Sequence, residues 1–323
     1  MEITVVGPGS VGTLLGGLLS LKGHRVTLRG RQSSPRGDRS VRIVLPDRWL
    51  VADGLRFEAP EDTVRASDAI LVTLGRHHLH LLRRPDFQKL IGASDAPVAF
   101  FNCDPAEPER LAAPPERTLL CVTAMNAVKL QDGDVELTSG EPSIIHQKSP
   151  FLGRILGSLG GFGFRVTAVE DARPSGNSLF VFQLLFLPVA MCNTTLSTFL
   201  SYPEGRELAA DILGEGLAVA EKADMPLAAL PVMDPRELAA ALARKPGSFE
   251  TGIEVPDRGY NSILQSYLTG RAIEAAQLNK RVVEIASSKG LHLTWNWRLL
   301  QKMSRVASMG FYREPAELLR SLV

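Results

Sequence analysis

The chain has 323 residues, of which 45% are hydrophobic and 22% charged, a composition that supports a buried core and excludes a wholly disordered chain. Lys and Arg number 36 against 35 Asp and Glu, and this balance gives no electrostatic reason to expect a nucleic acid or an anionic membrane as partner. Three scattered cysteines, Cys103, Cys121 and Cys192, are too few for a disulfide scaffold, which favours an intracellular protein. The length suits two domains of about 150 residues each.

The first half of the chain alternates short apolar runs with helical or turn-rich segments. A β-branched run at 3–6 predicts a strand, and leucines at helical spacing then predict a helix that Gly23 ends. Further strands are predicted at 25–28, 69–74, 98–102 and 119–123, followed by a hairpin of 135–138 with 143–146 and a last strand at 164–169. Continuous apolar runs suit strands buried on both faces, so the pattern favours a parallel sheet covered by helices.

From about residue 169 the pattern changes to helices. Helical periodicity is clearest at 204–223, 235–244 and 273–288, and it continues at 295–308 and 314–323. The sequence therefore predicts an α/β fold in two domains. A Rossmann-type, doubly wound and mostly parallel sheet is expected over 1–168, and an all-α domain over 169–323.

A glycine-rich turn follows the first predicted strand and opens the first predicted helix. It reads Gly-Pro-Gly-Ser-Val-Gly over residues 7–12 and fits G-x-G-x-x-G. In this motif Gly7 permits the tight turn, Gly9 lets the backbone approach a pyrophosphate, and Gly12 allows close helix–strand packing. The free N–H groups and the dipole at the helix start, around Ser10 and Val11, would then hold the phosphates. The sequence therefore predicts a dinucleotide site here.

The end of the second predicted strand indicates which dinucleotide binds. An acidic residue there would bind a ribose 2′-hydroxyl, but the chain has Arg29 and Arg31 instead. A guanidinium is the natural partner of a 2′-phosphate, because its fork donates two charge-assisted hydrogen bonds. The alternative is a solvated arginine-rich loop, since further arginines follow at 36, 39 and 42. NADP(H) is favoured over NAD(H).

Four segments carry a family resemblance beyond the turn. They read Ile-Leu-Val-Thr-Leu at 70–74, Phe-Phe-Asn at 100–102, Asn-Ser-Ile-Leu-Gln at 261–265 and Gly-Arg-Ala-Ile-Glu at 270–274. In this order the chain resembles the ketopantoate reductase (2-dehydropantoate 2-reductase) family over nearly its whole length. The resemblance implies hydride transfer from NADPH to a 2-keto acid in a cleft between the two domains, the helical one serving substrate binding and dimerisation.

The resemblance also implies roles for single residues. Leu74 would contact the cofactor, and Asn102 the substrate or the nicotinamide ribose. Ser262 would bind the substrate carboxylate, and Glu274 would orient the acid and the reacting hydroxyl. Asn193 would lie in the substrate pocket. Structural readings remain open, since Asn102 could cap the following turn and Glu274 could be an exposed helix charge.

One departure from the family pattern concerns the reaction itself. The family's general acid is a lysine, which Leu185 replaces, and a pocket asparagine of the family is replaced by Val189. No lysine or arginine occurs anywhere from 174 to 203, so a small shift of the alignment does not restore the lysine. Losing a proton donor in carbonyl reduction costs on the order of 10²–10⁴-fold in rate.

Three explanations of this departure are open. The donor comes from elsewhere, with Glu274, Tyr260 and Tyr267 as candidates. Alternatively the substrate is an imine, whose nitrogen needs less help from an acid, or the protein binds the dinucleotide without redox chemistry. Apolar residues at 185 and 189 indicate a partly apolar small-molecule substrate. We therefore expect an NADPH-dependent reductase of a ketone or imine carbon rather than of ketopantoate, with a non-redox NADP(H)-binding sensor or interaction protein as the alternative.

For two further features we prefer a structural interpretation to a functional one. Histidines at 77, 78 and 80 lack the i,i+4 spacing of a metal pair, so a helix start is favoured and no metal site is predicted. The uncharged stretch 174–203 is long enough to cross a membrane. It contains Gln183 and Pro188, however, and a buried helix lining the cleft is favoured over a membrane span. We expect a cytoplasmic homodimer.

Overall fold

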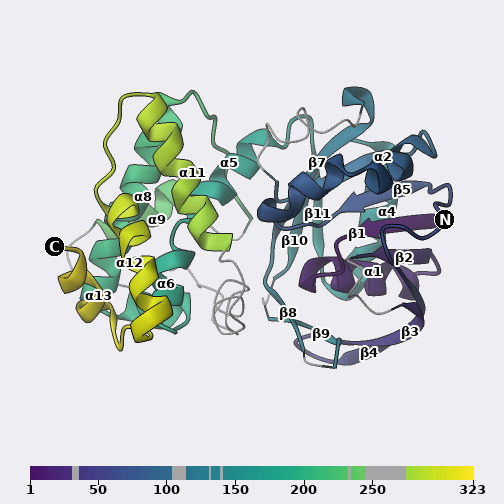
Figure 1. The fold of residues 1–323 in the computed structure, drawn as a ribbon, viewed down its shortest axis with the longest axis horizontal. Coiled ribbons are helices and arrows are strands. Elements are labelled where there is room, and N and C mark those ends of the chain that lie inside the picture. The colour runs from purple at the N-terminus through teal and green to yellow at the C-terminus, as the bar shows by residue number, and fades with distance from the viewer. Residues whose placement is uncertain (31–35, 104–113, 131, 139–140, 232–233, 244–273) are drawn as a thin grey trace. The chain divides into compact units, whose positions relative to one another are not determined.

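The computed structural model describes residues 1–30, 36–103, 114–130, 132–138, 141–231, 234–243 and 274–323. The chain divides into two compact units, Met1–Gly176 and Asn177–Val323. The first unit contains the sheet and the second is helical, as Figure 1 shows, which confirms the predicted fold class.

Eleven strands of the described residues form one sheet, in the order β11-β10-β7-β6-β5-β1-β2-β4-β3-β9-β8. The strands are β1 (Glu2–Val6), β2 (Arg25–Arg29), β3 (Gly37–Val44), β4 (Trp49–Glu58), β5 (Ala69–Val72), β6 (Val98–Phe101), β7 (Thr118–Ala124), β8 (Ala127–Lys129), β9 (Val135–Leu137), β10 (Ser143–Gln147) and β11 (Arg165–Val169). From β7 through β4 in this order, all neighbouring strands are parallel. The antiparallel pairs are β3 with β4, β8 with β9 and β7 with β10.

Helices of the first unit cover both faces of the central strands. They are α1 (Ser10–Leu21), α2 (Pro85–Gly92) and α4 (Pro150–Gly157), with the 3-10 helices η1 (Arg76–Arg83), η2 (Pro115–Arg117) and η3 (Ser158–Phe162). On β1, Val5 packs in the core that contains the α1 and α4 leucines, while Val6 packs in the core that contains Phe87 of α2. Successive residues of a strand point to opposite faces, so this alternation places β1 between two apolar layers.

The predicted hairpin of 135–138 with 143–146 is wrong. β9 pairs with β8 and β3, whereas β10 pairs with β7 and β11, at the other end of the sheet. Residues 43–44 of β3 supply the partner of β9 from about ninety positions earlier in the chain. Sequence reasoning also missed β3 and β4, because the first four residues of β3 are all exposed and give no buried apolar pattern.

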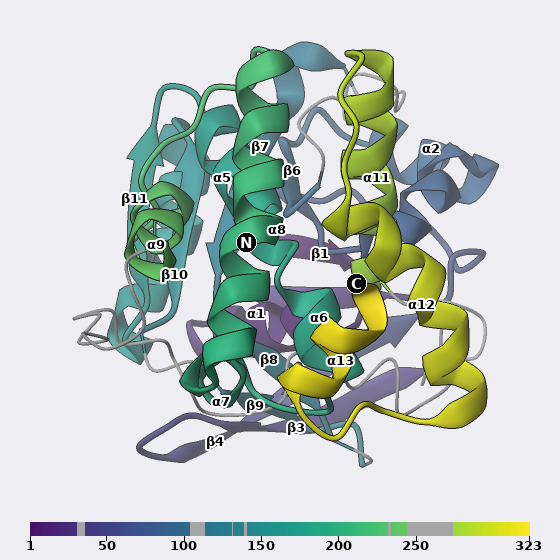
Figure 2. The ribbon, with the colours of Figure 1, turned by 90° about the vertical axis from the view of Figure 1, so that its left-hand side faces the viewer.

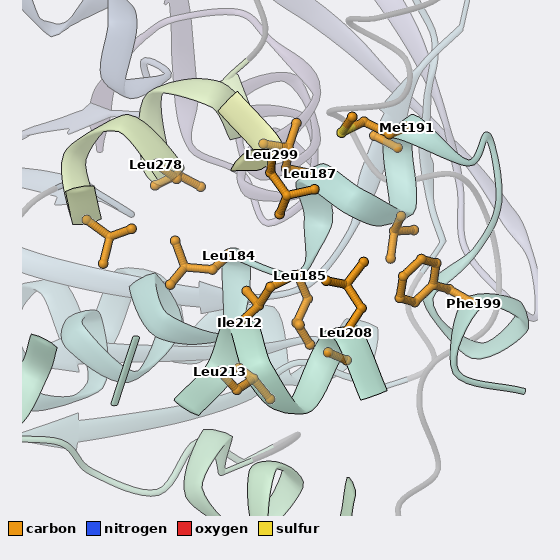
Figure 3. Packing of buried hydrophobic residues seen from close by; sticks show 14 of the residues in the cluster. Leu184, Leu185, Leu187, Met191, Phe199, Leu208, Ile212, Leu213, Leu278 and Leu299 are labelled. Carbon is orange, nitrogen blue, oxygen red and sulfur yellow. The ribbon is translucent and has the colours of Figure 1, made fainter. Parts of the chain in front are cut away.

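The second unit is built from helices around one apolar core. They are α5 (Arg173–Gln183), α6 (Phe186–Met191), α7 (Leu196–Ser201), α8 (Pro203–Lys222), α9 (Pro235–Leu242), α11 (Glu274–Ser288), α12 (Trp295–Met309) and α13 (Pro315–Leu322). Figure 2 shows α13 close to the lower half of α8, the longest of these helices, and α13 also contacts α6. Apolar residues of α6, α8, α11 and α12 meet in the core that Figure 3 shows.

The uncharged stretch is mostly buried in the core up to Met191, as predicted, but it is not one regular helix, and its place beside a cleft stays a prediction. Among the described residues, only Arg173–Met191 is long and apolar enough to cross a membrane, and 78% of its apolar window is buried inside the protein. The helix is interrupted at Leu184 and Leu185, whose N–H groups bond three residues back, to Val181 and Phe182. The cause is Pro188, which has no N–H and whose ring excludes a regular helical carbonyl at Leu184.

A single carboxylate caps α12 from another helix. Glu215 of α8 accepts hydrogen bonds from the backbone N–H groups of Thr294 (2.5 Å), Trp295 (2.8 Å) and Asn296 (2.9 Å), and from the Asn296 amide (2.8 Å). The side-chain amide of Asn279 on α11 donates to the side-chain oxygen Oδ1 of Asn296 at 2.7 Å, and both asparagines are fully buried. Glu215 therefore ties α8 to α12 and compensates the positive end of α12, while Asn296 links α12 to α11.

We expect Glu215→Ala to lower the free energy of unfolding by about 3 kcal/mol, because it strips the charged acceptor from several N–H groups at once. Urea denaturation followed by circular dichroism measures the change. Glu221→Ala, an exposed site on the same helix, is the matched control and should change stability by less than about 0.5 kcal/mol. Equal losses in the two variants would contradict the capping role.

Candidate functional site

The carboxyl ends of the central parallel strands bring several predicted residues to one edge of the sheet. Gly7 directly follows β1, Leu74 is the second residue after β5, and Asn102 directly follows β6. β1 lies between β2 and β5 and is parallel to both, so the strand order reverses direction beside it. Ligands of open α/β sheets bind outside the carboxyl ends at such a switch point.

The three glycines of the turn have different surroundings. Gly7 has a φ of +104°, which other residues rarely adopt, and its N–H donates to the Arg29 carbonyl at 2.9 Å. A Cβ on Gly12 would lie 2.1 Å from the Gly7 carbonyl oxygen and 2.4 Å from Thr73 Oγ1. A Cβ on Gly9 would meet nothing within 4 Å. Gly12 is thus required for packing, and the backbone at Gly9 is open to a ligand.

Helix α1 begins at the open side of this turn. Gly9 is its N-cap residue and no side chain caps the helix, while Ser10 and Val11 in the first turn are half-buried. The first turn contains no acidic residue. The arrangement leaves the positive end of the helix dipole without a negative side chain of its own, which suits an anionic ligand.

Thr73 fixes the turn against β5 and was missed by sequence reasoning. Its hydroxyl donates to the Gly7 carbonyl at 2.8 Å and lies 3.2 Å from that of Val6. The next residue, Leu74, is half-buried and would touch any side chain placed at Gly7. A polar residue ending an apolar strand beside the glycine motif is the signal that could have identified Thr73.

Arg29 is occupied inside the fold, although it was predicted to bind the cofactor. Its side chain is 2% exposed and lies 2.5 Å from the carboxylate of Glu58. It also donates to the backbone carbonyls of Pro60 (3.3 Å), Asp62 (3.2 Å) and Thr63 (3.1 Å). These contacts hold the segment after β4 and argue against a direct contact between this guanidinium and a 2′-phosphate. Arg31, the second predicted partner, lies outside the described residues.

Asn102 makes structural contacts at the end of β6. Its φ of +53° lies in the left-handed region, which asparagine tolerates better than most residues. The side-chain amide donates to Thr123 Oγ1 at 2.6 Å, and its oxygen accepts from the Thr123 N–H at 2.7 Å. The half-buried Asn102 therefore fastens the end of β6 to β7 at the edge where the cofactor is predicted to bind.

The predicted substrate residues of the second unit have unequal exposure. Leu185 and Val189 are fully buried, and Figure 3 shows Leu185 packed among leucines and Ile212. This burial argues against direct substrate contact. Asn193 is exposed with a φ of +47° and ends α6 in a Schellman motif, in which its N–H bonds to Ala190 and that of Thr194 to Val189.

Other predicted residues lie at or beyond the limits of the described structure. Glu274 is the first residue of α11, but its side chain is outside the described part. Ser262, Tyr260 and Tyr267 fall within 244–273, which is also outside it. Their predicted roles stay predictions.

Cysteine and histidine chemistry gains no support from the described residues. All three cysteines are buried, and burial raises the pKa of the Cys121 thiol well above its usual range and that of Cys192 to about 12. These thiols stay protonated and are poor nucleophiles. Among the described residues no group of three or more His, Cys, Asp or Glu side chains could hold a metal ion.

Comparison with known proteins identifies the family. Residues 3–148 match the model of ketopantoate reductase PanE/ApbA, and residues 182–307 match the model of its C-terminal domain. The chain belongs to the ketopantoate reductase PanE/ApbA family. Enzymes of this family reduce 2-oxo acids with NAD(P)H. No curated protein matches the chain.

Solved structures share the fold of this ketopantoate reductase family member at low sequence identity. A PanE/ApbA family ketopantoate reductase from Ralstonia eutropha JMP134 is 17% identical with a TM-score of 0.75, over 96% of this chain and 99% of that one. A D-mandelate dehydrogenase with NADH and anilino(oxo)acetate is 16% identical with a TM-score of 0.75, over 95% and 98%. A dimeric ketopantoate reductase from Staphylococcus aureus is 14% identical with a TM-score of 0.68, over 95% and 99%.

Proposed function

We propose that the protein is an NADPH-dependent reductase that transfers hydride to a ketone or imine carbon. The observation that carries the proposal is the glycine-rich turn at the carboxyl end of β1. There Gly12 packs against the turn, Gly9 is open, and the uncapped start of α1 faces the same place. This is the geometry that a dinucleotide pyrophosphate requires. Family membership supports the hydride transfer.

We propose NADP(H) rather than NAD(H) because of Arg31. The neighbouring Arg29 is committed to Glu58, so a 2′-phosphate would depend on the arginine that follows. The D-mandelate dehydrogenase of the same fold contains NADH, so the preference of this chain for NADPH needs a direct test.

Arg31→Ala should raise the dissociation constant of NADPH about 10- to 100-fold. The variant loses a bidentate, charge-assisted hydrogen bond between the guanidinium and the 2′-phosphate, which contributes about 1.5–3 kcal/mol. Binding of NADH should not change. Titration with cofactor fluorescence measures both constants. Arg39→Ala, at an exposed site on β3, is the matched control for the loss of one charge. An unchanged NADPH constant in Arg31→Ala would rule out the 2′-phosphate assignment.

We propose that the substrate is not ketopantoate; the apolar character expected of it from Leu185 and Val189 loses its support, because both side chains are buried in the core. By the resemblance, Leu185 and Val189 stand where the family has its catalytic lysine and a pocket asparagine, and no lysine or arginine occurs from 174 to 203. An imine fits this absence, because its nitrogen is protonated more readily than a carbonyl oxygen. Proton donors proposed for a ketone substrate are Glu274, Tyr260 and Tyr267.

Steady-state oxidation of NADPH against 2-keto acids, apolar ketones and cyclic imines tests the reductase. We expect turnover with at least one of the latter two classes and little with ketopantoate. Glu274→Ala removes the proposed catalytic carboxylate, and its rate of NADPH oxidation serves as the background rate. Glu284→Ala, on the same helix, controls for the loss of one negative charge. Turnover no higher than in Glu274→Ala with every compound would count heavily against a reductase.

A second candidate function is a non-redox NADP(H)-binding sensor or interaction protein. The charge-free stretch 174–203 favours it, because a chain that has lost its general acid keeps the cofactor site without the chemistry. It predicts that NADPH binds with a fluorescence change and that no compound is reduced. Binding without turnover therefore separates this candidate from the reductase.

We also propose that the protein is a cytoplasmic homodimer. A ketopantoate reductase of the same fold is described as dimeric, which supports the assembly. Light scattering of the purified chain tests it, and a monomer mass at micromolar concentration would contradict it.

A further inference from the structure

A lysine from a distant strand reaches the glycine-rich turn. Lys129 is the last residue of β8, the strand at one end of the sheet order, where it pairs with Val135 of β9. Its Nζ donates a hydrogen bond to the carbonyl oxygen of Pro8 at 2.9 Å, across 121 positions of sequence. β8 and α1 are in contact, so the fold itself brings this side chain to the turn.

The Pro8 carbonyl belongs to the peptide group that leads into Gly9. Gly9 is exposed, has open space around its missing Cβ, and is the N-cap residue of α1. A pyrophosphate held by the N–H groups at the start of α1 would therefore lie beside the Lys129 ammonium group. The lysine and the helix start approach the same place from different elements.

The local charges favour an anion at this place. The positive end of the α1 dipole has no acidic residue in its first turn. The next two acidic residues after Lys129 in the chain, Asp132 and Asp134, both form ion pairs with Arg42. The Lys129 ammonium group and the start of α1 are both positive, so an anion bound beside them is attracted by both.

We propose that Lys129 binds the pyrophosphate of the dinucleotide. This inference rests on the proposed function, because it assigns a further residue to the same cofactor site. It predicts that Lys129 strengthens NADPH and NADH binding equally, since the pyrophosphate is common to both. Arg31, by contrast, is proposed to distinguish them.

Lys129→Met keeps the length of the side chain and removes its charge. We expect it to raise the dissociation constants of NADPH and NADH about tenfold each, and to leave that of 2′-AMP, which lacks a pyrophosphate, unchanged. The dependence of NADPH binding on salt concentration should weaken as well, because one ionic contact is lost. Lys129→Arg keeps the charge and should retain most of the affinity.

Lys148→Met is the control variant, because Lys148, directly after β10, is exposed and pairs with Glu170, directly after β11. Circular dichroism verifies that each variant folds. Unchanged NADPH and NADH constants in Lys129→Met would overturn the inference, and so would an equal weakening of 2′-AMP, which would indicate a merely structural contact. If the unaltered protein binds neither dinucleotide, the proposed function fails together with the inference.

Discussion

Gly12→Ala should lower the free energy of unfolding by about 3 kcal/mol and abolish measurable dinucleotide binding. The added methyl group would lie 2.1 Å from the Gly7 carbonyl oxygen and 2.4 Å from the Thr73 hydroxyl. Neither atom is the end of a flexible side chain, because Thr73 is held by its bonds to the carbonyls of Val6 and Gly7. Relief therefore requires α1 to move away from β1 and β5.

Gly9→Ala is the matched comparison for this variant. Its methyl group would meet nothing within 4 Å, and its φ of −77° is accessible to alanine, so stability should change by less than about 1 kcal/mol. Dinucleotide affinity should still fall about 30-fold, or ~2 kcal/mol, because the methyl group occupies the approach of the pyrophosphate. Thermal unfolding and NADPH fluorescence measure the two effects. Full NADPH affinity in Gly9→Ala would show that the cofactor does not bind over this residue.

The predictable part of the fold is the part set by neighbouring residues. The strand β1, the glycine-rich turn and α1 follow one another directly, and each has a local signal in apolar period or in glycine spacing. β5 and β6 are wholly buried four-residue runs, which give the same clear pattern. The carboxyl edge of the sheet, with Gly7, Leu74 and Asn102, could therefore be predicted.

The unpredictable part depends on contacts between distant residues. The register of β2 with β4 places Arg29 opposite the carboxylate of Glu58. Because β4 has no clear apolar pattern, this partner could not be foreseen, and Arg29 was interpreted as a cofactor ligand. The approach of Lys129 to Pro8 likewise depends on the place of β8 in the sheet. Pro188 does carry a local signal, and the break in the helix at Leu184 could have been predicted from it.

Arg29→Met should lower the free energy of unfolding by about 4 kcal/mol, because it leaves the Glu58 carboxylate, 8% exposed, without its buried partner. Arg56 also contacts Glu58 at 2.9 Å, but its side chain is 43% exposed and compensates the charge only in part. Urea denaturation measures the loss, and hydrogen exchange of the β2 and β4 amides should locate it. Arg25→Met, at an 82% exposed site that pairs with Glu2, should cost less than about 1 kcal/mol.

The double variant Arg29→Met with Glu58→Met decides between a structural and a ligand-binding role for Arg29. Removal of both buried charges should recover most of the lost stability, since neither desolvated ion remains unpaired. NADPH affinity in the double variant should then stay within about threefold of the unaltered protein, because the 2′-phosphate is assigned to Arg31. If the double variant is folded and loses affinity for NADPH but not for NADH, Arg29 binds the 2′-phosphate and its assignment as a structural residue is wrong.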